Sequence, residues 1–167
     1  MTEQSQPAST VWLTQKTHDR LHAELEELKG PLRAEIIARI SAARDEGDLK
    51  ENGGYHSAKD EQGKMEGRIR QLEDMLRQAT TEPAADDGRV SAGKVVTYRY
   101  QGDDETEQFL LGSRDIDDDE VDVEVFSPQS PLGAALDGAA KGETIDFEAP
   151  NGRTLKIEIV DAVPFAG

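Results

Sequence analysis

A short polar segment near residue 50 concentrates charged side chains of both signs, and its residue types could do chemistry. Asp48 and Glu51 lie three positions apart, so one helical turn or a tight bend places both carboxylates on the same side of the chain. Mg²⁺ keeps several waters and is usually bound by one or two carboxylates together with phosphate oxygens. The pair could therefore complete a metal site only when another molecule supplies phosphates or further acids. The other charged residues of the segment are Arg44, Asp45, Glu46, Lys50 and Lys59.

The chemistry open to these two acids depends on what they meet. In a two-metal site the second ion positions and activates the water that attacks a phosphodiester, so a shared Mg²⁺ would suit cleavage of a nucleic acid. Acids in a polar turn can also be solvated side chains that bind nothing. Spacing alone favours the second interpretation, and both stay open at this point.

No other group of residues predicts chemistry as directly. His18 and His22 are four positions apart, a spacing that can bind a metal on a helix but more often marks a surface pair. The chain has no cysteine, which excludes disulfides, a thiol nucleophile and cysteine metal sites. It also contains no glycine-rich phosphate loop and no serine in a nucleophile-elbow context.

The composition argues against one large core. Only 35% of the 167 residues are hydrophobic and 5% aromatic, against about 45–50% apolar residues in an average domain. The net charge of −16, from 35 acidic and 19 basic side chains, argues against wrapping DNA, so any contact with nucleic acid should be local or made through a partner. No apolar run approaches the ~18 residues of a membrane span. We expect a cytoplasmic protein with no membrane partner.

The flanking sequence predicts the elements that position the acidic segment. Thr14 is a plausible N-cap of a first helix, and Gly30-Pro31 predicts a kink or brief break within it. Two apolar seams predict an antiparallel coiled-coil hairpin about 45 Å long with the acidic tip at residues 45–52. A coiled coil that dimerises the chain is the alternative, and we expect a monomer. The seam residues are Leu21, Leu25, Leu28, Leu32, Ile36, Ile37, Ile40 and Ala43, then Tyr55, Ala58, Gln62, Met65, Ile69, Leu72, Leu76 and Ala79.

The second half of the chain changes to short β-rich runs, so the fold class is α+β with two domains. Val121, Val123 and Val125 alternate with acids, as expected of a half-buried antiparallel strand. Ser130 is a possible N-cap of a short helix over the sheet. We expect strands near residues 93–100, 106–112, 121–127, 144–149 and 154–161, with a hairpin turn at 150–152.

The domain boundaries follow from composition. Residues 1–10 are expected to form a flexible tail, 11–82 the coiled coil, 83–92 a linker and 93–167 the sheet domain. The acidity belongs mostly to the second half. Residues 1–82 carry 12 basic and 16 acidic side chains, a net charge of −4, whereas residues 83–167 carry 7 and 19, a net charge of −12.

Two long motifs resemble the bacterial Gre transcript-cleavage factor family, and its GreA branch in particular. The first is EGDLKENGGYHSAKDEQG, residues 46–63, followed by the helix EGRIRQLEDML. The second is SPQSPLGAALDGAAKGE, residues 127–143, with the turn APNG at 149–152. The likeness covers residues 12–165. It implies an N-terminal antiparallel coiled-coil hairpin and a C-terminal antiparallel sheet with a short helix, similar to FK506-binding proteins.

The resemblance also implies a function. Members of this family bind RNA polymerase at the rim of its secondary channel through the C-terminal domain, and the coiled-coil tip reaches the polymerase active site. There they stimulate the polymerase's own cleavage of backtracked RNA and so rescue arrested complexes. The implied protein is therefore not an enzyme itself. It has no cofactor of its own and shares Mg²⁺ with the polymerase.

The family's functional positions map onto residues of this chain. Asp48 and Glu51 match the two acids that assist in the polymerase active site and hold the shared Mg²⁺, which makes the solvated-turn interpretation much less favoured. The residues that face the 3′ end of the backtracked RNA match Arg44, Lys59 and Tyr55. The polymerase-binding positions match Ser127, Pro128, Ser130, Pro131, Leu132 and Gly133.

Two other functions compete with transcript cleavage. A Gre-like regulator could occupy the same channel and inhibit transcription without cleavage, but the intact Asp48 and Glu51 pair favours cleavage. A prolyl isomerase or scaffold is suggested by the domain likeness, but the chain has few aromatic residues to line its pocket. Gly53-Gly54 departs from the acidic or alanine residues usual in the family, and predicts a looser start to the second helix.

Overall fold

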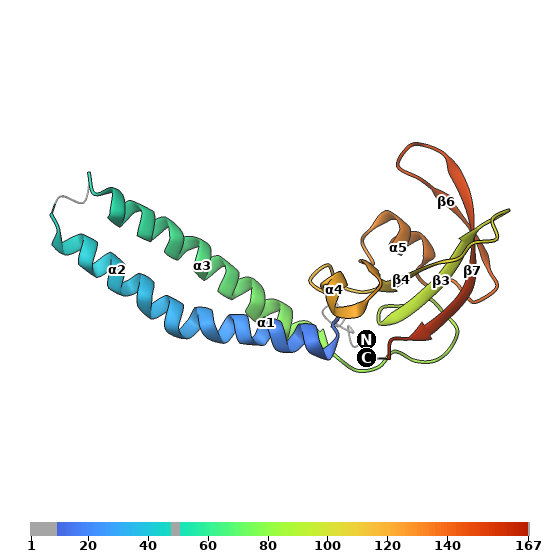
Figure 1. Cartoon of the computed structure of the whole chain (residues 1–167), viewed down its shortest axis with the longest axis horizontal. Coiled ribbons are helices and arrows are strands. Elements are labelled where there is room, and N and C mark those ends of the chain that lie inside the picture. The colour runs from blue at the N-terminus through green and yellow to red at the C-terminus, as the bar shows by residue number, and fades with distance from the viewer. Residues whose placement is uncertain (1–9, 48–50, 167) are drawn as a thin grey trace, which may run out of the picture. The chain divides into compact units, whose positions relative to one another are not determined.

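The computed structural model describes residues 10–47 and 51–166 and divides the chain into two compact units. One unit is helical and spans residues 18–78. The other combines residues up to 17 with residues from 79 onward and contains the sheet. Figure 1 shows the helices and strands of both units. The expected fold class, a helical hairpin followed by a small sheet domain with a short helix, is confirmed. The predicted flexible tail falls on residues 1–9, outside the described residues, and Thr10.

The helical unit is an antiparallel hairpin. Its first arm consists of α1 (Gln15–Glu27), a π-helical turn η1 (Leu28–Leu32) and α2 (Arg33–Asp45), and its second arm is α3 (Gly53–Gln78). Figure 1 shows α2 and α3 running side by side. The predicted N-cap is confirmed, because the Thr14 hydroxyl accepts a hydrogen bond of 3.0 Å from the Thr17 backbone N–H.

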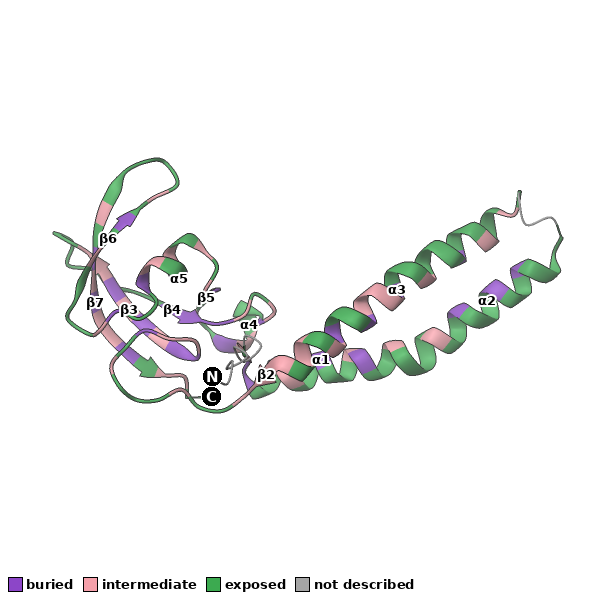
Figure 2. Ribbon diagram, turned by 180° about the vertical axis from the view of Figure 1, so that it is seen from behind, coloured by how far each residue is buried: buried purple, intermediate pink, exposed green. Residues whose placement is uncertain are grey.

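The two arms pack through the apolar seam, with buried residues along the hairpin and exposed residues outside it (Figure 2). Most predicted seam positions are confirmed, but Leu32 and Ile37 are wrong because they are 38% and 51% exposed. After the phase shift the seam takes Ile36 and Ile40, and this leaves Ile37 on the solvent side. The buried seam residues are Leu21, Leu25, Ile36, Ile40, Ala43, Ala58, Met65, Ile69 and Leu72.

The expected break at Gly30-Pro31 is replaced by the π-helical turn. Pro31 lies inside η1, and the backbone N–H of Arg33 donates to the carbonyl of Gly30. In an α-helix the proline ring clashes with the carbonyl four residues earlier. A π turn is wider than an α turn, so the helix continues past Pro31, which has no backbone N–H to donate. The inserted spacing is also what shifts the phase of the seam.

Arginine–glutamate pairs connect the two arms along the hairpin. Arg33 binds both carboxylate oxygens of Glu66 at 2.9 and 2.8 Å, and Arg68 binds both oxygens of Glu24 at 2.7 and 3.0 Å. The Arg68 hydrogen bond holds the pKa of Glu24 below its usual value. Half-exposed pairs add about 0–1 kcal/mol each. Their fixed bidentate geometry therefore contributes more to the register of the hairpin than to its stability.

The sheet unit holds five strands in the order β5-β4-β3-β7-β6. They are β3 (Lys94–Tyr100), β4 (Glu107–Leu111), β5 (Glu124–Phe126), β6 (Thr144–Glu148) and β7 (Thr154–Pro164). Every pairing is antiparallel except that of β4 with β5, which is parallel, so the expected all-antiparallel sheet is corrected to a mixed one. The predicted hairpin between β6 and β7 is confirmed, with Gly152 at φ +86° in its turn.

The parallel pairing follows from a short helix that the sequence pattern did not predict. α4 (Asp118–Val121) lies between β4 and β5 and turns the chain so that β5 enters in the same direction as β4. Asp117 and Glu120 form a capping box at its start. Val121 is therefore buried at the end of a helix and is not in a strand.

The core of this unit lies between the sheet and α5 (Pro131–Leu136). Leu136 and Ala139 pack against the inward-facing strand residues, and Val90 joins them. Val90 lies in residues 83–92, which were expected to be a linker; it is fully buried, and its backbone bonds to Ala139. The buried Lys94 ammonium donates to the Asp87 carboxylate and to the carbonyl of Arg89. The hydrogen bond from Lys94 lowers the pKa of Asp87.

The segment before the first helix also belongs to the sheet unit. β1 (Val11–Trp12) pairs in parallel with β2 (Ala79–Thr80), and the Trp12 indole donates a hydrogen bond of 2.9 Å to the carbonyl of Glu82. These contacts place residues 11–17 and 79–82 with the sheet, whereas the sequence pattern assigned them to the coiled coil. Among the described helices, none has the length and apolarity needed to cross a membrane.

Candidate functional site

The tip of the hairpin is held by the ends of its two helices. Glu46 closes α2 by donating its backbone N–H to Ala43, and Gly47 follows at φ +128°, a backbone angle that favours glycine. Asn52 then caps α3, because its side-chain oxygen accepts 3.0 Å from the Tyr55 N–H. Its amide also donates to the carbonyl of Ala43, across the hairpin. Asn52 thus joins the two helix ends beside the predicted acids.

The predicted acidic pair is only partly within the described residues. Asp48 lies outside them, as does Lys50. Glu51 is exposed and directly precedes Asn52. Its carboxylate has the oxygen chemistry that Mg²⁺ prefers. Sequence reasoning missed Asn52, although asparagine is a preferred N-cap residue, because the Gly53-Gly54 pair that follows it does not indicate a helix start.

The three residues predicted to face RNA lie together at the tip end of the hairpin. The Arg44 guanidinium is 5.9 Å from the centre of the Tyr55 ring, a cation–π distance that links α2 to α3. The Lys59 ammonium donates to the Gln62 side-chain oxygen at 3.1 Å. Arg44 and Lys59 line one hollow of about 300 Å³. Tyr55 contacts Arg44 but does not line that hollow.

The predicted polymerase-binding residues separate into two groups. Ser127, Ser130 and Gly133 build the loop itself and its helix cap. Ser130 accepts 3.1 Å from the Gly133 N–H and donates 2.7 Å to the Ser127 carbonyl, so the predicted N-cap is confirmed. Pro131 is exposed, and Pro128 and Leu132 are half-buried. Ser130 is half-buried as well, and Leu132 also packs against the core of the sheet unit, so Pro131 is the exposed member of the six predicted residues.

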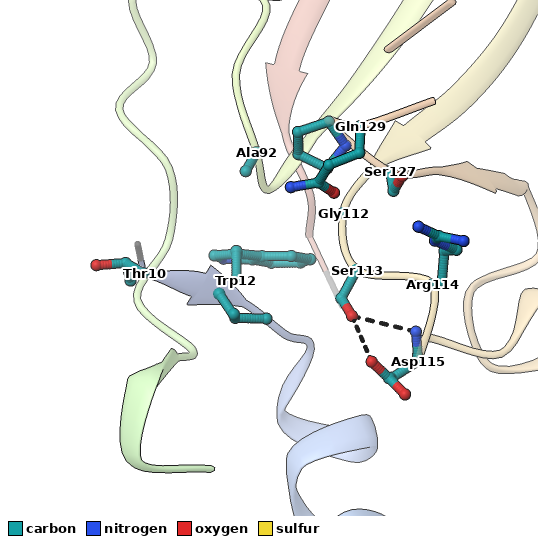
Figure 3. Close-up of a pocket in the computed structure, with 11 residues that line it drawn as sticks. Thr10, Trp12, Ala92, Gly112, Ser113, Arg114, Asp115, Ser127 and Gln129 are labelled. Atoms are coloured by element: carbon teal, nitrogen blue, oxygen red, sulfur yellow. Dashed lines mark hydrogen bonds between the residues drawn. The ribbon is translucent and has the colours of Figure 1, made fainter. Parts of the chain in front are cut away.

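Two hollows adjoin at this loop, and Arg114 lies on both. One, of about 260 Å³, is drawn in Figure 3, which shows Trp12, Gln129 and Arg114 around it. The other, of about 380 Å³, includes Phe126 and Pro131. Arg114 is exposed, and it follows Ser113, whose hydroxyl bonds Asp115 at 2.8 Å. The sequence pattern did not identify Arg114 or Trp12, because neither lies in the Ser-Pro block.

Substitution of Gly133 tests how closely this loop packs around the start of α5. A Cβ at this position would lie 2.1 Å from the Ser127 carbonyl oxygen and 2.8 Å from the Ser130 hydroxyl. Alanine in a helix normally stabilises relative to glycine, but here overpacking should make Gly133→Ala destabilising by about 1–3 kcal/mol. Urea unfolding followed by Trp12 fluorescence measures this, since Trp12 is the chain's one tryptophan and reports on the sheet unit.

The matched control is Gly63→Ala in α3, where nothing lies within 4 Å of the new Cβ. That change should stabilise the hairpin by about 0.5–1 kcal/mol. Unfolding monitored by circular dichroism measures this. If Gly133→Ala were also stabilising, the close packing of this loop would be contradicted.

Comparison with known proteins places both units in one class, the bacterial transcription elongation factors. Residues 11–80 match the model "Transcription elongation factor, N-terminal" and residues 85–163 match "Transcription elongation factor, GreA/GreB, C-term". The chain belongs to the GreA/GreB transcription elongation factor family. The resemblance drawn from the two sequence motifs is therefore confirmed.

Several relatives match over nearly the whole chain. The transcription elongation factor GreA of Streptomyces avermitilis is 50% identical and covers 100% of both chains. That of Saccharopolyspora erythraea is 52% identical over 94% of this chain and 96% of its own, and that of Mycobacterium tuberculosis is 47% identical over 93% and 95%. Among solved structures, GreA factor homolog 1 of Thermus thermophilus is 25% identical with a TM-score of 0.41, over 92% of this chain and 98% of that one.

Proposed function

We propose that this elongation factor enters the secondary channel of RNA polymerase with its helical hairpin and stimulates the polymerase's own cleavage of backtracked RNA. The observation that carries the proposal is family membership across both units, with 50% identity to a GreA over the full length. The structure adds a support: Glu51 is exposed and directly precedes the cap of α3, and Arg44 and Lys59 line one hollow between α2 and α3. The factor works in the cytoplasm as a monomer.

The tip residues have separate roles in this proposal. Asp48 and Glu51 would hold a Mg²⁺ shared with polymerase carboxylates and RNA phosphates, and such an ion supplies activation of a water and stabilisation of negative charge. The factor has no cofactor of its own and does not cleave RNA alone. Asn52, the residue after Glu51, bonds both helix ends and so ties the start of α3 to the end of α2.

The sheet unit is the docking domain in this proposal. The exposed Pro131, the half-buried Pro128 and Leu132, and the two hollows around Arg114 form a surface with apolar and cationic parts. A cation on an otherwise strongly acidic domain suits an acidic side chain of the polymerase. This surface is supported by the family match of the Ser-Pro block and by its accessibility.

Reversing the charge of Arg114 tests this docking surface. Arg114→Glu should weaken polymerase binding by about tenfold, since a charge at the centre of a contact surface typically contributes more than 1 kcal/mol. The control is Arg153→Glu in the turn before β7, which changes the net charge equally at another exposed arginine. Displacement of labelled wild-type factor from polymerase by each variant measures the affinity of both variants. Equal binding of the two variants would mean that docking occurs elsewhere.

The cleavage activity is tested on a stalled elongation complex with end-labelled RNA. Addition of the factor should shorten the RNA and restore elongation, whereas the factor without polymerase should leave the RNA intact. A factor that slows elongation and produces no shortened RNA would instead support the inhibitory regulator. The same experiment therefore separates the two functions that use the secondary channel.

A prolyl isomerase is disfavoured by where the aromatic residues lie. Tyr98 and Phe109 are 3% and 0% exposed, and their rings pack edge to face with centres 5.6 Å apart. The Tyr98 hydroxyl also bonds Glu107 at 2.7 Å, and burial together with this bond raises its pKa. These side chains fill the core and are not free to line a pocket for a proline substrate.

A further inference from the structure

The tip end of the hairpin carries an Asn-Gly pair that the proposed roles of the acids and cations do not involve. The chain has two asparagines, Asn52 and Asn151, and each is followed by a glycine. Asparagine is a thermolabile residue. In an Asn-Gly pair the backbone nitrogen of the glycine can attack the asparagine side chain, because no Cβ on the glycine shields that nitrogen. Asn52 directly precedes α3, and Asn151 lies in the turn between β6 and β7.

The structure holds the Asn52 side chain by both of its polar atoms. The side-chain oxygen accepts a hydrogen bond of 3.0 Å from the backbone N–H of Tyr55, and the side-chain amide donates to the carbonyl of Ala43. A donor already aimed at this oxygen stabilises the negative charge that develops there when a nucleophile attacks the side-chain carbon. Gly53, which supplies the nucleophile, is the first residue of α3, where backbone N–H groups have no acceptor within the helix. The fold therefore polarises the attacked group and leaves the attacking nitrogen outside the helical hydrogen-bond ladder.

The second Asn-Gly pair is held differently. The Gly152 backbone N–H donates to the carbonyl of Ala149 at 2.9 Å, and Gly152 has a φ of +86°. This nitrogen must leave the turn before it can attack, although Asn151 is exposed and Asn52 is only half-buried. The Asn151 oxygen also accepts a hydrogen bond of 3.0 Å, from the Arg153 N–H. The two pairs therefore differ in the availability of the nucleophile and not in the polarisation of the carbonyl.

We propose that Asn52-Gly53 is a self-modification site, at which the folded tip converts Asn52 into aspartate or isoaspartate. A bond forms between the Gly53 nitrogen and the Asn52 side-chain carbon. The bond from that carbon to the side-chain nitrogen breaks, and this nitrogen leaves as ammonia with the proton that Gly53 loses. Water then opens the cyclic imide, on one side to aspartate and on the other to isoaspartate. Water is the one co-reactant, and nothing is oxidised or reduced.

Conversion of Asn52 removes the tie between the two helices at the tip. An aspartate still accepts from the Tyr55 N–H and keeps the cap of α3, because aspartate is a preferred N-cap residue. An ionised carboxylate has no hydrogen to donate, so the bond to the Ala43 carbonyl is lost. A new negative charge also follows the exposed Glu51 in the chain. Ageing therefore loosens the tip of the factor without unfolding the hairpin.

The first experiment follows both pairs in the full-length factor by peptide mass mapping. Trypsin releases residues 51–59 and 142–153, each of which contains one asparagine and no glutamine. After storage in mildly alkaline water enriched in heavy oxygen, peptide 51–59 should carry heavy oxygen in place of its amide nitrogen, at a rate at least equal to that in urea. Peptide 142–153 should convert about fivefold more slowly in the folded protein than in urea, the effect of one hydrogen bond that must break. Slower conversion of Asn52 in the folded protein than in urea would overturn the proposal.

Two alanine substitutions separate attack by Gly53 from a general effect on the helix. Gly53→Ala places its Cβ in open space, and this methyl group should slow conversion of Asn52 by about tenfold or more because it obstructs the approach of the nitrogen. Gly54→Ala is the matched control, since its Cβ makes an ordinary contact of 3.4 Å with the Asn52 side-chain oxygen and Gly53 is unchanged. Both substitutions favour the helix. Equal rates of conversion in the two variants would show that Gly53 does not supply the nucleophile.

The consequence for the tip is measured on stalled elongation complexes, and this measurement rests on the proposed function. Aged wild type and fresh Asn52→Asp should stimulate cleavage about fivefold less than fresh wild type, the effect of one lost hydrogen bond, with little change in melting temperature. Aged Gly53→Ala should keep its initial activity. If the converted factor cleaves as well as the fresh one, the tie to Ala43 has no role at the tip and this consequence is wrong. If fresh wild type stimulates no cleavage, the proposed function fails, and the peptide map still decides the modification.

Discussion

Replacing Glu51 with Gln is expected to leave the factor folded and bound to polymerase but to lower stimulated RNA cleavage about 100-fold, since charge stabilisation by a catalytic metal ion is worth several kcal/mol. Asp48→Asn should act in the same way. Loss of one carboxylate removes both a ligand and a negative charge from a weak Mg²⁺ site that the factor shares with its partner. Raising the Mg²⁺ concentration should partly restore the rate, because the affected step is recruitment of the ion.

Folding should be unaffected because Glu51 is exposed and lies outside the buried seam. Exposed substitutions of this kind usually change stability by less than about 0.5 kcal/mol. Asp60→Asn is the control, since Asp60 is an exposed acid of α3 whose carboxylate pairs with Lys64, one turn away. Its loss should leave cleavage unchanged. Full stimulation by the double variant of Asp48 and Glu51 would contradict the proposed role of the tip.

The sequence predicted most of the hairpin because heptad spacing reports directly on which side of a helix is buried. Ile40 and Leu72 follow this pattern and are buried. The spacing could not choose between adjacent isoleucines at 36 and 37, because the choice depends on the π turn at Leu28–Leu32. That turn accommodates Pro31 within the helix, and no periodic spacing of residues indicates it. The exposed Ile37 was missed for the same reason.

Caps were predicted where a single residue type decides them. Thr14 and Ser130 both accept the expected backbone hydrogen bonds. Val121 was placed in a strand because it continues an alternating pattern. The capping box of Asp117 and Glu120 instead stabilises the start of α4, and Val121 is the last residue of that helix. Short helices of this kind are easily missed, since one turn has too few residues to show a period.

The candidate site was predicted by residue type, but its arrangement was not. The motif around residues 46–63 identified the acids and cations of the tip through family resemblance. Which of them share a surface follows from the crossing of α2 and α3, and the structure brings Arg44 and Lys59 together with Ile37 and Gln62. The bridging role of Asn52 depends on the carbonyl of Ala43, nine residues earlier in the chain. Only the folded hairpin brings these two residues together, so the sequence pattern could not predict this contact.

Trp12 was the least predictable structural residue, because a lone tryptophan ahead of a helix gives no pattern. In the structure it is 8% exposed and meets the Phe165 ring edge to face at 6.1 Å. A Cβ on Gly93 would lie 2.9 Å from the indole, so the glycine backbone and the ring are in close contact. The indole N–H also satisfies the Glu82 carbonyl. Trp12 therefore closes the sheet unit with a residue from the opposite end of the chain.

Trp12→Ala should accordingly destabilise the sheet unit by about 3–5 kcal/mol, the usual cost of truncating a buried tryptophan. Urea unfolding followed by circular dichroism measures this, since the variant has no tryptophan left to report by fluorescence. Trp12→Phe should cost less, because it keeps most of the apolar contact and loses the hydrogen bond to Glu82. A fragment of residues 84–167, which lacks Trp12 and Leu13, should be less stable still. A fragment as stable as the whole chain would show that residues 10–17 are not part of the sheet unit, and the boundary would return to the position that composition suggests.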